Sequence, residues 1–402
     1  MKIAHHKIIA LICFSFSLDS LLKIPLGGIN IHVGLFFLVA GMGSLLIRRR
    51  FLAEFILFAK ENLFLSLYVL YCILQFPLAS SNSTFFFVLI FLIIPYVLYF
   101  YIYSQKDKIR YKPIFLAMLL TVLSGGIIQM AFFYILDHQI TLGGVEDSYY
   151  DKGTSVDSRV RGFFLEPNWF GLFLTFCLIG YLATIRRYSL IIILLSFLIA
   201  LLAYLSGNRL SNFFVLLTLM VFVFSSMSKP LLSFSTLILG SIPILFFLYS
   251  VIGLGDGGAT IEDRSLSART LTAAKVLIFI FLNFDFQDYI IGLGFSNWSE
   301  VALENSLTSR SELLESGSAL RDTSESYIFL LEGGLLGCLF IFLDSLRFVL
   351  RTYKFYPEKG LTAMIASLFL FSAAFYYPIF FFMPYLIPYF LIRTFCQIER
   401  RV

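Results

Sequence analysis

The sequence predicts an all-α protein that crosses a membrane many times, and three observations lead to that fold class. First, 59% of the 402 residues are hydrophobic, and the mean hydropathy is +0.88. Second, only 14% of the residues are charged, whereas a soluble domain carries about 25%. Third, the apolar residues form blocks of about 17–24 residues, the length that crosses a hydrocarbon core as a helix.

The blocks predict helices rather than strands of a barrel. Inside lipid the backbone must bond to itself, so only helices or a closed barrel can span. Barrel strands alternate in segments of about 10 residues, while the blocks here are longer and uniformly apolar. We therefore expect one membrane domain over 1–402 with about twelve spans. The expected spans are 8–22, 29–47, 62–79, 84–103, 113–136, 164–184, 189–206, 210–226, 231–252, 325–346, 361–376 and 379–395.

The basic residues predict which side of the membrane each loop occupies. With the N-terminus inside, 20 of the 30 Lys and Arg residues fall in cytoplasmic segments and 10 on the other side. This excess follows the positive-inside rule, so we expect both termini in the cytoplasm. The first apolar run follows Lys2 and Lys7 without a small-residue cleavage site, and we interpret it as a signal anchor.

Two long polar loops are expected on the outer, non-cytoplasmic side. They cover 137–163 and 253–324, and both are rich in Gly, Ser, Asp and Glu. The second loop contains an apolar stretch, 271–282, which is too short to span comfortably and includes Lys275. We expect this stretch to form a helix in the interface or against the bundle.

Other classes of site have little support in the sequence. The five cysteines fall in or at the ends of apolar blocks, so a disulfide framework or a cysteine-based metal site is not expected. The four histidines lack metal-ligand spacing, and no Gly-rich phosphate-binding motif is present. The net charge of +5 does not indicate nucleic acid, because the charges lie between spans.

Four arginines on the expected outer side run against the positive-inside trend. Arg161, Arg209 and Arg321 lie at the edges of spans, and Arg269 precedes the apolar stretch of the large loop. Arginine at a membrane surface suits bidentate recognition of phosphate. One interpretation is a cluster that binds a lipid-linked phosphate or pyrophosphate, and the other is a set of interface anchors paired with acidic residues of the loops.

The densest local motif is RVRGFFLEPNWFG, residues 159–171. Pro167 suits the first turn of a helix, and Glu166 would lie beside the positive end of that helix. Asn168 then opens the span at the headgroup level, beside a Trp of the kind common there. Glu166 could serve as a general base or orient an arginine, or the motif could simply be a well-made helix N-terminus.

Three further motifs follow along the chain. SGNR, 206–209, predicts a tight turn between two spans. IGLGFSNW, 291–298, predicts a turn marked by glycines, and SESYIFLLEGGLLG, 324–337, enters the next span. In that span Gly333, Gly334 and Gly337 would let another helix approach closely. Glu332 lies about two turns into it, as a functional residue or as a partner in a buried hydrogen bond.

In this order, the motifs resemble those of the bacterial O-antigen polymerase and ligase family, the Wzy/WaaL type. The family pattern has an Arg-Gly…Pro-Asn segment opening a central span, a Ser-x-Arg turn two spans later, and a long periplasmic loop. That loop has an Arg before an apolar helix, a Gly-x-Gly turn and a Tyr…Glu-x-Gly-x-x-Gly entry into the next span. The resemblance covers about residues 155–345.

The resemblance implies a GT-C-like membrane glycosyltransferase. Its substrate would be an oligosaccharide on undecaprenyl pyrophosphate, at the outer face of the bacterial inner membrane, with no metal or cofactor. The implied catalytic residues are Arg161, Glu166, Arg269 and Glu325, and the implied substrate-binding residues are Arg159, Asn168, Arg209, Arg321 and Tyr327. Membrane lipid is an expected partner, nucleic acid is not, and a chain-length regulator remains open.

Within this family the sequence favours a polymerase of lipid-linked repeat units. Members similar to the ligases usually carry a His just before the last motif, whereas here that place holds Ser324 and Glu325, and the large loop has no His. The alternatives are a ligase that transfers polysaccharide to lipid A-core and a flippase for lipid-linked oligosaccharides. A flippase would be expected to have short loops and charges within spans in both halves. A purely structural membrane protein would leave the outer arginines unexplained.

Overall fold

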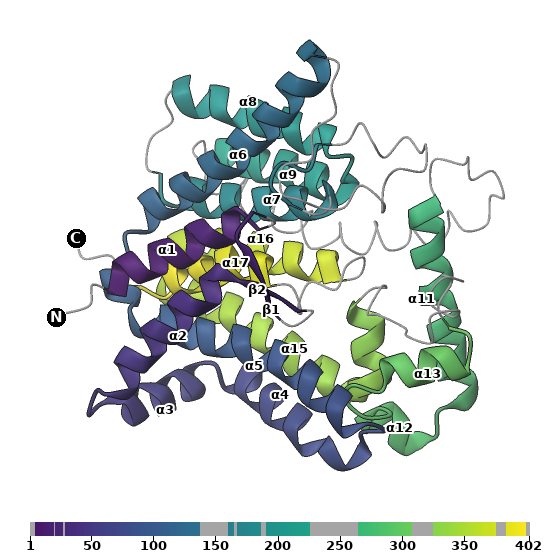
Figure 1. Cartoon of the computed structure of the whole chain (residues 1–402). Coiled ribbons are helices and arrows are strands. Elements are labelled where there is room, and N and C mark those ends of the chain that lie inside the picture. Colours follow the sequence, from purple (N-terminus) through teal and green to yellow (C-terminus); the bar gives the residue numbers. More distant parts are fainter. Residues whose placement is uncertain are drawn as a thin grey trace.

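The structure is a computed structural model that describes residues 5–19, 21–26, 29–136, 160–164, 167–185, 190–225, 264–307, 325–374 and 383–398. The regular secondary structure of these residues is helical apart from one small hairpin (Figure 1). The elements are α1 (His5–Ser17), β1 (Lys23–Leu26), β2 (Ile29–His32), α2 (Val33–Leu46), α3 (Phe51–Glu61), α4 (Leu63–Leu74), η1 (Phe76–Leu78), α5 (Asn82–Ser104), η2 (Lys106–Lys108), α6 (Tyr111–Leu136), α7 (Pro167–Ala183), α8 (Leu190–Leu205), α9 (Arg209–Ser225), α11 (Arg264–Asn283), α12 (Phe286–Ile291), α13 (Trp298–Glu304), α15 (Glu325–Phe355), α16 (Pro357–Ala374) and α17 (Met383–Cys396).

The helices have the character of a membrane protein. Among the described residues, α5, α6 and α15 are long and apolar enough to cross a membrane. The pair α3 and α4 would be a fourth such element if counted as one span, although it bends by 99° between Glu61 and Leu63. Shorter apolar helices form parts of α2, α7, α8, α9, α11 and α17. The structure therefore agrees with an all-α membrane protein, and the count of twelve spans stays a prediction.

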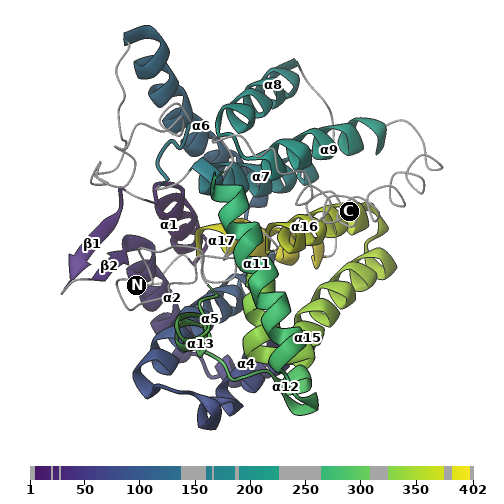
Figure 2. The same cartoon turned by 90° about the vertical axis from the view of Figure 1, so that its right-hand side faces the viewer.

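Two expected boundaries were wrong, and the structure gives the reason for each. The expected span 29–47 begins instead with β2, which pairs antiparallel with β1 from Lys23–His32 to Leu26–Ile29. Gly-Gly separates the two strands in the sequence, a dipeptide that favours hairpins. The segment 51–61, expected between spans, is the helix α3. Figure 2 shows the hairpin at the edge of the molecule.

The other expected spans that fall on described residues coincide with helices within a few residues, except that α15 continues well beyond its expected end. The apolar stretch 271–282 lies in the longer helix α11. The expected span 231–252 lies outside the described residues, as do 137–159 and parts of the large loop, 253–263 and 308–324.

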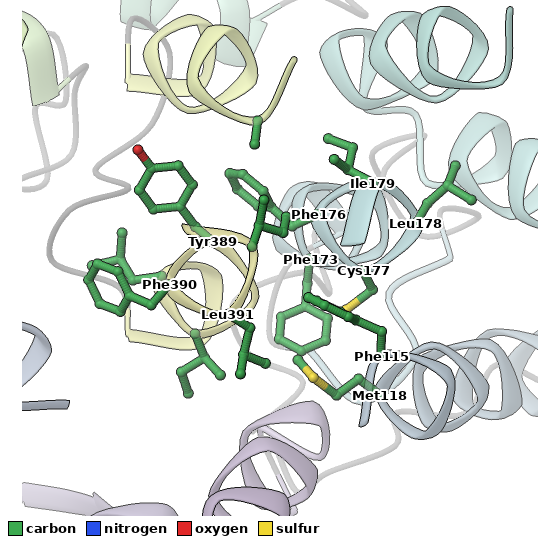
Figure 3. Packing of buried hydrophobic residues seen from close by; sticks show 14 of the residues in the cluster. Phe115, Met118, Phe173, Phe176, Cys177, Leu178, Ile179, Tyr389, Phe390 and Leu391 are labelled. Carbon is green, nitrogen blue, oxygen red and sulfur yellow. The ribbon is translucent and has the colours of Figure 1, made fainter. Parts of the chain in front are cut away.

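The core is centred on α7. Side chains all round this helix are buried, including the run Leu172–Ile179, and a helix that is apolar on every side is expected to be surrounded by others. Its rings and aliphatic chains pack against Phe115 and Met118 of α6 and against Tyr389 and Phe390 of α17 (Figure 3). This packing fixes the position of the first turn of α7, which belongs to the motif of residues 159–171.

A second, smaller cluster joins the described helices of the large loop to α15. Val276 and Ile280 of α11 and Trp298 of α13 pack with Ile328 and Leu331 of α15. In Figure 1, α11, α12 and α13 lie together on the right-hand side, away from α7 and α9. The loop helices thus belong to the α15 side of the molecule.

Candidate functional site

The first two sequence motifs lie side by side at one end of α7. The Val160 amide donates to the Leu205 carbonyl at 3.0 Å, which joins the segment 160–164 to the turn after α8. The Asn208 side-chain amide donates to the Asn168 carbonyl at 2.9 Å, and its Oδ1 accepts the Ser211 amide at 3.1 Å. Asn208 therefore caps α9 and joins it to α7.

Arg161 is held at this end by its main chain. Gln129 of α6 accepts both the Arg161 and Gly162 amides on its Oε1, at 2.8 and 2.9 Å. Gly162 has φ of +52°, a left-handed conformation that glycine adopts easily. The Arg161 side chain is partly exposed. One glutamine thus fixes the backbone from which a cation projects at the edge of the core.

The third and fourth motifs also lie together, at a break in α15. The Leu293 and Gly294 amides donate to the Leu331 and Glu332 carbonyls at 2.9 and 3.1 Å. The hydroxyl of Tyr71 in α4 lies within hydrogen-bonding distance of the carbonyls of both Ile291 and Gly333, at 2.7 and 2.9 Å. The turn of residues 291–298 is therefore bonded directly to the broken turn of α15.

Gly334 explains the break. It has φ of +58° and ψ of −164° inside α15, a region that is essentially restricted to glycine. A Cβ there would lie 2.5 Å from the Gly292 nitrogen and from the Ile290 carbonyl oxygen. A Cβ on Gly333 would meet Tyr71 at 3.8 Å, and one on Gly337 would meet Tyr71 at 3.4 Å and Tyr68 at 3.8 Å, all in the range of ordinary contact or just below it. Of the three glycines expected to allow close packing, Gly334 is the one whose conformation requires glycine.

The Glu332 side chain makes a structural hydrogen bond between the third and fourth motifs. The residue is 1% exposed, and its Oε1 accepts the Trp298 amide at 3.0 Å, at the first turn of α13. A carboxylate is a strong acceptor for a helix N-terminal amide. Of the two roles expected for Glu332, the geometry supports that of a partner in a buried hydrogen bond.

The remaining predicted site residues are placed in part. Tyr327 lies in α15 and packs against the cluster of Val276 and Trp298. Arg209 begins α9, Arg269 lies within α11 and Glu325 begins α15, but the description of these three residues is limited to the backbone. The predicted site residues that lie outside the described residues are Arg159, Glu166 and Arg321.

A buried ion pair that the sequence did not reveal joins Asp344 of α15 and Arg393 of α17. These residues are 5% and 3% exposed, and their charged groups are in direct contact. Arg393 also donates to Asn62 Oδ1 at 3.1 Å, and Asn62 accepts the Tyr99 hydroxyl at 2.9 Å. The pair therefore joins α15, α17 and α5 to the bend between α3 and α4.

A charge inside each of two expected spans was the available signal for this pair. Asp344 lies near the expected end of the span 325–346, and Arg393 near the expected end of 379–395, among the residues assigned above to the cytoplasm. Because intramembrane charges usually pair with each other, matching them would have predicted the contact. The Asp344 carboxylate and the two Nη atoms of Arg393 are paired within the core, so we assign the pair to stability.

Comparison with known proteins does not add a family. No protein-family model matches the chain, and no curated protein matches it. Within the described part of the chain, no group of three His, Cys, Asp or Glu side chains lies together as metal ligands would. The candidate site therefore rests on its own residues, of which Arg161, Gln129, Asn168 and Asn208 form the best-placed set.

Proposed function

We propose that this chain is a bacterial inner-membrane glycosyltransferase that joins oligosaccharide repeat units into a surface polysaccharide. The donor and the acceptor are both carried on undecaprenyl pyrophosphate at the outer face of the membrane. The proposal combines the membrane character of the helices with the ordered motifs that resemble O-antigen polymerases.

The observation that carries the proposal is the contact between the first two motifs. About 40 residues separate the segment 160–168 from the turn 205–211 in the sequence, yet they share the bonds Val160–Leu205 and Asn208–Asn168. This arrangement places Arg161 and the first residue of α9, Arg209, on neighbouring segments. Two motifs implied to bind one substrate are expected to be adjacent, and these are.

The proposed chemistry is a glycosyl transfer without a nucleotide sugar. The bond between the reducing-end sugar and the pyrophosphate of the growing chain breaks, and the pyrophosphate leaves with the electron pair. A hydroxyl of the next lipid-linked unit attacks the same carbon and gives up its proton to Glu166 or Glu325. Arg161, Arg209, Arg269 and Arg321 stabilise the charge that develops on the leaving pyrophosphate, because fixed cations favour that transition state.

The proposal includes an orientation. Both termini and the segment 106–112 lie in the cytoplasm, and the loop 253–324 lies outside, because the Lys and Arg residues other than the buried Arg393 divide 19 to 10. An alkaline phosphatase fusion near Ser311 is then active, and a fusion near Lys108 is inactive. The reverse pattern would place the candidate site on the wrong side of the membrane for this substrate.

The test of the reaction uses the purified full chain in lipid vesicles with undecaprenyl-pyrophosphate-linked repeat units as the sole sugar substrate. A polymerase yields a ladder of longer lipid-linked chains without lipid A-core, nucleotide sugar or added divalent metal. Activity that appears only when lipid A-core is added would identify a ligase. Movement of the lipid-linked unit across the vesicle membrane without any new glycosidic bond would identify a flippase.

A further inference from the structure

A pocket of about 210 Å³ lies where the ends of several helices meet, away from the motifs described above. α3 ends at Glu61, Lys106 lies two residues after the end of α5, and Arg351 lies near the C-terminal end of α15. Gln397, directly after α17, completes this side of the pocket. Four segments that are distant in the sequence thus contribute polar side chains to one hollow.

The pocket carries more positive than negative charge. Arg351 lies 3.3 Å from Glu61 Oε1, and Lys106 Nζ lies 4.0 Å from Glu61 Oε2. Of the residues that line the pocket in the described part of the chain, two are cations and one is an acid. A single carboxylate is therefore shared between two cations and leaves a net charge of +1.

The pocket partly removes Lys106 from water, which disfavours its charged form. Burial lowers the pKa of Lys106, and the carboxylate of Glu61 only partly restores it. The ammonium also lies 4.1 Å from the centre of the Tyr103 ring. Helix C-termini favour nearby cations, which accounts for their location, but an additional anion in the pocket would stabilise Lys106 and Arg351 further.

The remaining walls fit a ligand that is charged at one end and apolar at the other. Phe348 and Phe355 of α15 line the pocket beside the polar groups, and Phe355 is 58% exposed at the surface. Basic pockets between transmembrane helices on the cytoplasmic side are sites at which anionic lipid headgroups bind. In the orientation proposed above, this pocket lies on that side.

We propose that this pocket binds a phosphate group, with Lys106 and Arg351 as its cationic contacts. The phosphate is that of an anionic membrane lipid or of a soluble phosphate compound. Binding requires no glycosyl transfer, so the site depends on the proposed orientation of the chain but not on the proposed reaction. Glu61 competes with the phosphate for the same two cations.

The experiment measures the melting temperature of the detergent-purified full chain during titration with phosphatidylglycerol, phosphatidylcholine or inorganic phosphate. A ligand that binds only the folded state raises the melting temperature, and the dependence on concentration gives an apparent affinity. A saturable rise with phosphatidylglycerol but not with phosphatidylcholine assigns the site to anionic lipid. An equal rise with inorganic phosphate assigns it to a soluble ligand, and no rise with either phosphate source overturns the proposal.

Variants locate the effect in the pocket. Lys106→Gln should weaken the apparent affinity by about tenfold, as expected for the loss of one charge-assisted contact. Lys354→Gln is the matched control, because it removes the same charge from an exposed position of α15. Lys354 does not line the pocket. Equal weakening in both variants would show general surface electrostatics and overturn the site.

Glu61→Gln gives an effect of opposite sign. Removal of the competing carboxylate should strengthen phosphate binding, even though it also removes the ion pairs with Arg351 and Lys106. If the pocket served only to hold this ion cluster together, Glu61→Gln would lower the melting temperature without any gain in affinity. That result would also overturn the proposal, and it does not depend on how the lysine variants fold.

Discussion

The α7–α9 end and the α12–α15 junction are built in a similar way, yet they use their charged residues differently. In each region two motifs that are distant in the sequence are joined by main-chain hydrogen bonds. At the α7–α9 end the neutral side chain of Gln129 fixes the backbone, and Arg161 remains partly exposed. At the junction the charged side chain itself, Glu332, is buried and bonded to the Trp298 amide.

This difference teaches that a charged residue in a motif is not by itself a catalytic residue. Glu332 supplies an acceptor that the fold needs, so its charge serves stability. Gln129 binds the amide of Arg161 rather than its side chain, and that side chain is partly exposed at the edge of the core. The comparison predicts that substitutions at the junction act mainly on stability, whereas side-chain substitutions at Arg161 act mainly on activity.

The largest expected effect on stability is that of Gly334→Ala. The φ of +58° excludes an ordinary side chain, and the Cβ would lie 2.5 Å from main-chain atoms of Gly292 and Ile290. We expect a loss of about 3 kcal/mol, measured by thermal unfolding in detergent. Gly333→Ala is the control, because its Cβ would meet only Tyr71 at 3.8 Å. Equal melting temperatures for the two variants would contradict the assigned break in α15.

Glu332→Ala should have the next largest effect. It leaves the buried Trp298 amide without this acceptor, at a cost of about 1–3 kcal/mol. Glu332→Gln keeps an oxygen at the same place and should retain most of the stability and the polymerising activity. If Glu332→Gln melted like the wild type but made no polymer, the junction would hold a catalytic carboxylate and the comparison would fail.

Gln129→Ala should affect both stability and activity. The substitution removes the acceptor for the Arg161 and Gly162 amides, which costs about 1–2 kcal/mol and releases the backbone that positions Arg161. Gln129→Glu keeps an acceptor oxygen and should restore much of both properties. The readouts are melting temperature and the length of polymer per folded molecule, and wild-type polymer length in Gln129→Ala would argue against a positioning role.

The smallest effects distinguish Asn208 from Asn168. Asn208→Ala removes both the cap on α9 and the bond to α7, at a cost of about 1 kcal/mol. Asn168 provides only its main-chain carbonyl to that bond, so Asn168→Ala should leave the melting temperature unchanged. Any loss of activity in Asn168→Ala would then report a direct role in substrate binding, whereas a matching loss of stability would contradict the assigned bonds.

The sequence predicted most helices because their apolar blocks are long and uniform, as for α5 and α6. It also predicted the turns at 206–209 and 291–298 from their glycines, and Gly207, Gly292 and Gly294 have positive φ. It missed the hairpin because β2, Ile29–His32, is continuous in the sequence with the apolar block of α2 and looks like part of the same helix. Periodicity alone cannot separate these cases.

The contacts between motifs were beyond the sequence. Gln129 has no distinctive neighbours in its helix, and its role appears only when α6 packs against the segment 160–164. Likewise Asp344 and Arg393 are 49 residues apart, and their pairing depends on how α15 and α17 pack. Long-range packing, rather than local propensity, decides which polar groups meet.

The most direct test of the account is polymer formation by Arg161 variants of the purified chain. Each variant is supplied with lipid-linked repeat units, and product length is compared at equal amounts of folded protein. Arg161→Ala should lower the rate by about 10²–10³-fold, as loss of a group that stabilises transition-state charge does. Arg161→Lys should remain substantially impaired, because it keeps the charge but loses the planar fork. Normal polymer from Arg161→Ala, with Glu332→Gln inactive in the same assay, would contradict the account and move the chemistry to the α12–α15 junction.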